Sequence, residues 1–241
     1  MTSHLPPLLR RALAEFVGTA LLVSIVVGSG IAAQQLSPTD TGLQLLQNST
    51  ATVLGLTVLI VIFGPVSGAH FNPVVSLVDW ILGRRSGSGL TLAEMGTYVL
   101  AQTVGAIGGS LLANAMFEVG TAISTKDRLT PGHLLAEIVA TAGLLLLISS
   151  LAATKRSTLA APAVGAYIGA AYWFTSSTSF ANPAVTVGRV FSDTFAGIAP
   201  SSAPGFIAAQ LIGAAVGLGL LALLFPVSSR SADDVVVPSI H

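Results

Sequence analysis

The 241-residue sequence contains no cysteine and few charged residues. Without cysteine, the chain can form no disulfide, thiolate metal site or cysteine nucleophile. Charged residues make up only 8% of the chain, whereas a soluble domain carries roughly 25%. Because 52% of the residues are hydrophobic and the mean hydropathy is +0.82, the polar residues are too few to cover a globule in water. These proportions indicate an integral membrane protein.

The charge balance and the histidine positions exclude further classes. Ten basic residues match ten acidic ones, which argues against a nucleic-acid partner. The four histidines lie far apart, at positions 4, 70, 133 and 241, and no nucleophile–base or metal-ligand constellation accompanies them. We therefore predict no enzymatic activity, no metal and no cofactor. We also expect no removed signal peptide, because no small-residue cleavage site follows a short apolar core.

Six apolar runs are long enough to cross a bilayer, which takes about 20 residues. We expect these spans near 12–33, 47–65, 91–114, 134–153, 159–177 and 204–225. Two shorter apolar segments, 72–82 and 182–191, are predicted to be re-entrant half-helices. Backbone of that kind is tolerated at membrane depth only where it is buried in protein or lines a wet cavity. The predicted fold class is an all-α membrane protein with six transmembrane helices and two half-helices.

Each half-helix begins at an asparagine–proline tripeptide: Asn72-Pro73-Val74 and Asn182-Pro183-Ala184. Asparagine is a favoured N-cap, and proline is tolerated at the first helical position, where its missing N–H would be unpaired anyway. Two such starts inside a membrane chain direct positive helix ends at a common place. The alternative, an ordinary Asn-Pro turn, does not explain why the motif occurs twice in register.

Three segment pairs, one of which contains the tripeptides, recur in the same order, so the chain contains two homologous halves. The matches are 13–20 with 135–142, 71–75 with 181–185, and 101–106 with 209–214. Since each half has three spans, the second must enter the membrane upside down, which makes an inverted repeat. We expect one channel domain over 1–225, with repeats at about 10–114 and 132–225, and a cytoplasmic tail over 226–241.

The basic residues predict the orientation of the chain. With both termini in the cytoplasm, seven basic residues are cytoplasmic and three lie outside or in the outer re-entrant loop. The cytoplasmic set is Arg10, Arg11, Arg84, Arg85, Lys155, Arg156 and Arg230, and the outer set is Lys126, Arg128 and Arg189. The expected location is the plasma membrane, with lipid as a partner.

These motifs resemble those of the major intrinsic protein family, the aquaporins and aquaglyceroporins. The resemblance covers nearly all of 10–225 and includes the paired tripeptides, the Ala-Glu-x-x-x-Thr motif of spans one and four, the lead-in 67–70, and Gln-x-x-Gly-Ala in spans three and six. It implies the aquaporin fold, a passive pore for water or small neutral solutes, and assembly as a homotetramer with one pore per subunit.

The asparagines and the residues before them are the predicted centre of the pore. If the Asn72 and Asn182 side-chain oxygens cap their own helices, each carboxamide NH₂ is free to orient a passing oxygen. Together with the positive helix ends, this opposes cations and proton conduction, which is the kind of barrier known from aquaporin-type pores. Gly68, Ala69, His70 and Thr178 are expected to line the pore.

The outer selectivity filter departs from the family pattern. The arginine that most members carry after the second tripeptide is replaced by Val185, and the family's spacing places the other filter positions at Thr52, Ala170 and Ser179. All four residues are small and uncharged, so we predict a wide, mildly polar filter. Arg189 lies one helical turn beyond Val185, and the sequence leaves open whether it reaches the pore.

The two glutamates in otherwise apolar spans, Glu15 and Glu137, are predicted to hold the re-entrant loops in place, with a proton relay as the less favoured alternative. His70 could line the inner mouth or act as a buried hydrogen-bonding spacer. The favoured function is a passive channel for water and small neutral solutes, such as polyols, urea-like solutes and arsenous acid. The alternatives are a water-selective aquaporin and, less favoured, an ion-coupled secondary transporter.

Overall fold

The computed structural model describes residues 7–226, and in this part of the chain the regular secondary structure is all helical. The predicted tail over 226–241 lies outside the described residues, apart from its first one. The helices are α1 Leu8–Leu36, α2 Thr41–Ser67, α3 Pro73–Ser86, α4 Leu92–Met116, α5 Pro131–Ala153, α6 Ala160–Phe174, α7 Pro183–Gly188 and α8 Ala203–Leu224, with the short 3₁₀ helices η1 Ser157–Leu159 and η2 Arg189–Phe191.

The predicted spans and half-helices correspond to these elements. Five helices, α1, α2, α4, α5 and α8, are long and apolar enough to cross a membrane. The fifth predicted span is shorter: α6 has 15 residues, which is about 22 Å at 1.5 Å per residue, and η1 adds one turn before it. The two half-helices, α3 and α7, have 14 and 6 residues, so neither can cross a bilayer alone.

Side-chain caps define where several helices begin. The Asp40 carboxylate accepts the Leu43 N–H at the start of α2. Thr91 and Glu94 form a reciprocal capping box at the start of α4, which pairs two backbone N–H groups that would otherwise have no acceptor. These polar residues end the apolar runs and therefore fix where each span leaves the apolar layer.

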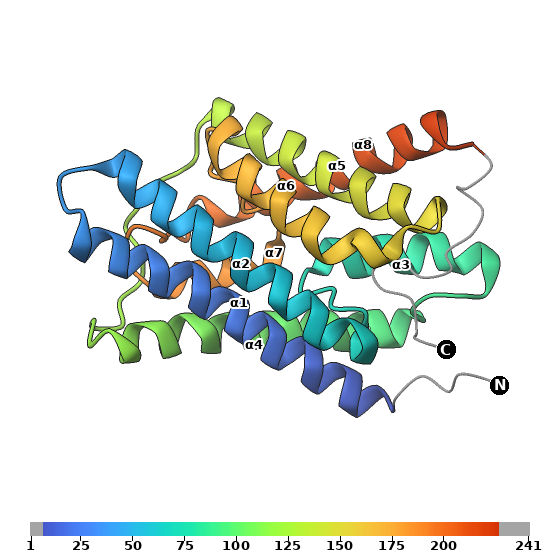
Figure 1. The fold of residues 1–241 in the computed structure, drawn as a ribbon, viewed down its shortest axis with the longest axis horizontal. Coiled ribbons are helices and arrows are strands. Elements are labelled where there is room, and N and C mark those ends of the chain that lie inside the picture. Colours follow the sequence, from blue (N-terminus) through green and yellow to red (C-terminus); the bar gives the residue numbers. More distant parts are fainter. Residues whose placement is uncertain (1–6, 227–241) are drawn as a thin grey trace.

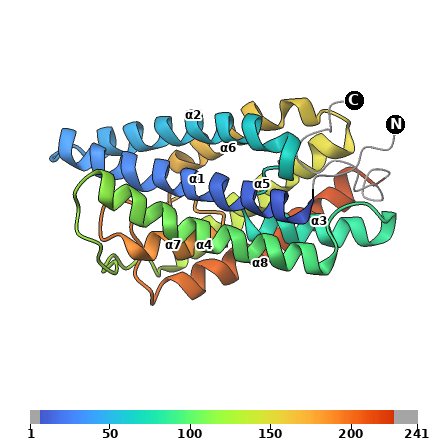
Figure 2. The ribbon, with the colours of Figure 1, turned by 90° about the horizontal axis from the view of Figure 1, so that it is seen from below.

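The two halves pack in the same way. Helix α1 lies against α4, and α5 lies against α8; the first pair runs side by side in both views (Figures 1 and 2). Glycines permit the close approach: a Cβ on Gly109 would lie 2.2 Å from the Ala20 carbonyl oxygen, and one on Gly217 would lie 2.8 Å from that of Ala142. Substitution there would force the helices apart.

The half-helices approach the middle of the molecule from opposite ends. In Figure 1, α3 extends toward the end of the molecule where α1 begins and α8 finishes, whereas α7 lies near the centre. The start of α1 and the finish of α8 thus lie at the same end, as an even number of crossings requires. We call the opposite end, which carries the α1–α2 and α4–α5 connections, the outer end, a label that follows the orientation predicted from the basic residues.

Candidate functional site

Each asparagine of the paired tripeptides caps its own half-helix. The Asn72 Oδ1 accepts the Val74 N–H at 3.0 Å. The Asn182 Oδ1 accepts the N–H groups of Ala184 at 3.0 Å and Val185 at 3.2 Å. In both cases a proline follows at the first helical position. Both side chains are therefore fixed at a helix N-terminus, where the helix dipole is positive.

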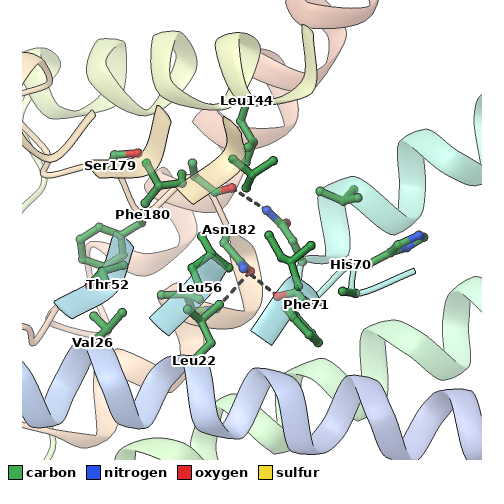
Figure 3. Close-up of a pocket in the computed structure, with 18 of the residues that line it drawn as sticks. Leu22, Val26, Thr52, Leu56, His70, Phe71, Leu144, Ser179, Phe180 and Asn182 are labelled. Atoms are coloured by element: carbon green, nitrogen blue, oxygen red, sulfur yellow. Dashed lines mark hydrogen bonds between the residues drawn. The ribbon is translucent and has the colours of Figure 1, made fainter. Parts of the chain in front are cut away.

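The two asparagines also bind across the repeat. The Asn72 Nδ2 donates to the Ala181 carbonyl at 2.8 Å, and the Asn182 Nδ2 donates to the Phe71 carbonyl at 2.7 Å (Figure 3). Each carboxamide has two N–H donors, so one donor on each remains for a solute. The expectation that the whole NH₂ group is free was wrong, because the opposite loop occupies half of it. These two reciprocal hydrogen bonds also join the two halves of the chain at their centre.

The first pore loop, residues 68–71, is held by Glu15. Its carboxylate is fully buried and accepts four hydrogen bonds. The donors are the Ser67 hydroxyl at 2.6 Å, the backbone N–H groups of His70 at 3.0 Å and Phe71 at 2.7 Å, and the Gln102 amide at 2.8 Å. A buried carboxylate needs this number of donors to offset the loss of its hydration.

The second pore loop, residues 177–181, has the matching arrangement around Glu137. Its carboxylate is also fully buried. It accepts from the Ser177 hydroxyl at 2.6 Å, the N–H groups of Phe180 at 2.9 Å and Ala181 at 2.8 Å, and the Gln210 amide at 2.7 Å. All eight donors come from corresponding places in the two repeats, so the inverted symmetry extends to single hydrogen bonds.

The pore loops need this support because their backbone is strained. Five residues other than glycine adopt a left-handed conformation there: Ala69, Phe71, Thr178, Ser179 and Ala181, with φ between 48° and 63°. A side chain in this conformation costs roughly 1–2 kcal/mol per residue. The carboxylate bonds offset that cost and keep the loops in a shape that turns their backbone toward the pore.

One cavity runs along the loops and past both asparagines. Seven of the predicted site residues line it: Thr52, Ala69, His70, Asn72, Ser179, Asn182 and Val185. Its opposite wall is apolar and comes from α1, α2, α5 and α6, including Leu22, Leu56 and Leu144 (Figure 3). Gly68, Pro73, Val74, Thr178, Pro183 and Ala184 do not line this cavity. The site thus has one polar side and one apolar side.

The predicted filter position in α6 was two residues off. Ala170 is exposed on the outside of the helix, whereas Ile168 and Tyr172 line the cavity. Residues four apart share a helix face, and a residue midway between them points away. The spacing taken from the family therefore does not hold in this part of the chain. The four-residue spacing of Val164, Ile168 and Tyr172 was the sequence signal that could have located this face.

Tyr172 reaches the filter residue of α2. Its hydroxyl lies 3.2 Å from the Thr52 Oγ1, and that oxygen already donates its single proton to the Asn48 carbonyl at 2.9 Å. The proton between the two hydroxyls therefore comes from Tyr172. Its phenolic oxygen keeps acceptor capacity, which suits a hydroxyl-bearing solute.

The outer part of the cavity also carries a charge and a second aromatic ring. Arg189 and Phe180 both line it, and the Arg189 Cζ lies 3.5 Å from the centre of the Phe180 ring. Two large aromatic side chains, Tyr172 and Phe180, and one charged side chain, Arg189, thus line the same cavity as the small, uncharged residues predicted for the filter. The sequence did not identify Phe180, because that residue lies in an irregular loop, and it left Arg189 open, because the direction of its side chain depends on its neighbours.

Two more cations lie in the loop between α4 and α5. The Arg128 guanidinium donates to the carbonyls of Gly197 at 2.8 Å and Phe195 at 3.0 Å, and burial lowers its pKa to about 10. Burial, followed by the charges of Arg128 and Arg189, lowers the pKa of Lys126. Three basic side chains thus gather at the outer end, where the acidic residues Asp127 and Asp193 also lie.

His70 lies at the other end of the cavity. Its Nδ1 is 3.0 Å from the Ser76 Oγ, and its ring makes an edge contact with Tyr98, the two centres being 5.4 Å apart. The half-buried ring is thus both a wall of the cavity and a hydrogen-bonded spacer. Both interpretations left open by the sequence describe part of its setting.

An all-helical membrane protein with an inverted repeat and two half-helices meeting at a lined cavity has the architecture of a membrane channel or of a secondary transporter. The sequence matches the family described as major intrinsic protein over residues 2–180. It is 50% identical to Aquaglyceroporin AqpS of Rhizobium meliloti (strain 1021) over 89% of each chain. It is 30% identical to Aquaporin NIP2-1 of Oryza sativa subsp. japonica, over 80% of this chain and 64% of that one.

The structure is similar to that of the aquaglyceroporin from Plasmodium falciparum, with a TM-score of 0.66 at 20% identity, covering 93% of this chain and all of that one. The chain belongs to the major intrinsic protein family, which consists of channels rather than enzymes. It is an integral, multi-pass membrane protein with the aquaporin fold.

Proposed function

We propose that the protein is a passive channel for water and for small neutral solutes that carry hydroxyl or amide groups, such as glycerol, urea and arsenous acid. The observation that carries this proposal is the two-sided cavity. The pore-loop side offers the free N–H groups of Asn72 and Asn182 and the Ser179 hydroxyl, and the facing wall is apolar apart from Thr52 and the Tyr172 oxygen. A polyol has oxygens along one edge and C–H groups along the other, which fits both sides at once.

The size of the solute follows from the outer filter. Val185, Ser179 and Thr52 have small side chains, so they leave more of the outer cavity open to a solute than large side chains would. The Tyr172 ring of α6 occupies part of this space. The relative in Rhizobium meliloti is named an aquaglyceroporin, and this supports glycerol as a test solute. A water-selective pore is the second candidate, favoured only by the Tyr172 and Phe180 rings beside the cavity.

A passive mechanism is supported by the placement of the acidic groups. Glu15 and Glu137 lie behind the pore loops, where four donors occupy each carboxylate, and neither lines the cavity. A transporter coupled to an ion must expose a group that binds the ion or a proton along the path. These carboxylates instead serve as fixed acceptors for the loop backbone, so an ion-coupled transporter is disfavoured.

We place the protein in the plasma membrane with both termini in the cytoplasm, as one channel domain over 1–225 that assembles as a homotetramer. The excess of basic residues at one end supports this orientation, and α1 begins at the same end where α8 finishes (Figure 1). Many large apolar side chains face outward, as expected for contact with lipid or with other subunits.

The test is light-scattering flux in proteoliposomes, with water, glycerol, urea and arsenous acid compared against empty vesicles. We expect fast flux of water and of at least one larger solute, with no dependence on a proton gradient. Water flux alone would establish the water-selective alternative. Flux that requires a proton gradient would replace the channel by a coupled transporter.

A further inference from the structure

Arg189 occupies a position that the function described so far does not use. It lies four residues after Val185, so both side chains are on the same face of the second re-entrant segment. Only 2% of its surface is exposed, yet it lines the cavity. The corresponding residue of the first repeat, Asp79, does not line the cavity, and its carboxylate accepts the Leu90 N–H at 2.7 Å. The inverted symmetry is therefore broken by a charge at the outer end.

The Arg189 guanidinium has no acidic partner in the described part of the chain. The ion pair found there joins Arg11 to Glu94, at the other end of the molecule. The Nε of Arg189 donates to the Ala196 carbonyl, and the group stacks on Phe180. Nε provides one of the five N–H donors of arginine, and no described protein group accepts the other four. A buried cation with no carboxylate in direct contact produces a strong local field, because little water screens it.

A second polar group that lines the same cavity has no hydrogen-bond partner within residues 7–226. The Ser179 hydroxyl lines the same cavity, is 4% exposed, and has no hydrogen-bond partner among the described residues. Buried hydroxyls are normally paired, so this one indicates a place for a solute oxygen or a water molecule. Arg189, Ser179 and Tyr172 therefore offer polar groups to the same cavity.

We propose that Arg189 supplies the fixed positive charge and the solute-binding N–H donors of the outer filter, from one helical turn beyond the position that Val185 occupies. The charge excludes cations, while the free N–H groups bind the oxygen of a neutral solute. Moving the arginine by one turn leaves the Val185 position apolar, so the filter keeps its charge and gains room. This inference rests on the proposed channel function and names its selectivity residue.

The absence of cysteine permits a direct test with Arg189→Cys, which introduces the only thiol of the chain. Purified variants in proteoliposomes are assayed for glycerol flux and for sodium and proton leak under a fixed membrane potential. The thiol is then labelled with aminoethyl or sulfonatoethyl methanethiosulfonate, which form a disulfide with the cysteine and release methanesulfinate. The first label restores a positive charge, and the second adds a negative one.

We expect Arg189→Cys to pass glycerol and to raise the cation leak at least about tenfold. The aminoethyl label should return the leak to near the wild-type level, and the sulfonatoethyl label should not. Arg128→Cys is the matched control, because Arg128 contacts the same Phe180 ring, at 5.4 Å, without lining the cavity. It should leak no more than the wild type.

Three results would overturn the proposal. They are a glycerol-conducting Arg189→Cys variant that excludes cations like the wild type, labels of opposite charge acting alike, and an equal leak through Arg128→Cys. Arg189→Gln, which keeps much of the side-chain shape, provides the same leak comparison if the cysteine variant does not insert. Failure of the channel function itself is distinguishable, because the wild type would then pass no glycerol above empty vesicles.

Discussion

Replacement of Glu137 by glutamine changes one atom at the support of the second pore loop. The carboxylate has two oxygens, each accepting one backbone N–H, from Phe180 or Ala181, and one side-chain donor, from Ser177 or Gln210. Glutamine keeps one oxygen and places an NH₂ group at the other. In either orientation of the amide, one backbone N–H then faces a donor instead of an acceptor.

The cost follows from these bonds. A hydrogen bond to a charged group contributes about 1.5–3 kcal/mol, so the lost backbone bond alone costs that much, and roughly twice as much if the side-chain donor finds no new acceptor. The loop also holds three left-handed residues, Thr178, Ser179 and Ala181, at a cost of about 1–2 kcal/mol each. The strain therefore favours release of the loop over unfolding of the whole helical bundle.

We expect Glu137→Gln to reduce solute flux in proteoliposomes at least about tenfold and to lower the midpoint of thermal unfolding in detergent, since about 3 kcal/mol is a large part of a typical 5–15 kcal/mol stability. Glu15→Gln should match it, because Glu15 accepts the same four kinds of bond. Glu118→Gln is the control, because that residue is exposed and should change neither quantity. Unchanged flux and midpoint in Glu137→Gln would refute the reasoning.

Three further outcomes follow from the cavity and the packing around it. Val185→Arg should reduce glycerol flux more than water flux, because it adds volume and charge to the outer cavity. A folded variant that passes glycerol as fast as the wild type would show that Val185 is not at the constriction. Gly18→Ala should lower the thermal midpoint, at a cost of about 1–3 kcal/mol, because the new Cβ would lie 2.0 Å from the Phe71 ring. Tyr172→Phe should lower the ratio of glycerol to water flux, because it removes a hydroxyl oxygen that can accept a hydrogen bond from the solute, together with the bond to Thr52. An unchanged ratio would place Tyr172 outside the solute path.

Much of the architecture followed from local chemistry. The apolar runs predicted the long helices to within a few residues, because a segment in lipid must satisfy its backbone internally and can do so only as a helix. The Asn-Pro pairs predicted the starts of α3 and α7, because a cap and a proline at the first position act within a few residues of each other. The duplication of these signals predicted the inverted repeat.

The arrangement of the site depended on contacts between segments far apart in the chain. The exchange between Asn72 and Asn182 joins residues more than 100 positions apart, and only their meeting at the centre determines which N–H groups stay free. The rotation of α6, set by its packing on α2, brings Tyr172 rather than Ala170 to the cavity. The direction of Arg189 likewise depends on the Ala196 carbonyl and the Phe180 ring.

The sequence by itself therefore determined which segments cross the membrane, where the half-helices begin and which family the chain resembles. These features depend on side chains acting on their own backbone, at short range. Only the tertiary structure decided which side chains face the pore and which donors remain for a solute. That decision depends on the rotation and approach of packed helices, and these are set jointly by all the surfaces in contact.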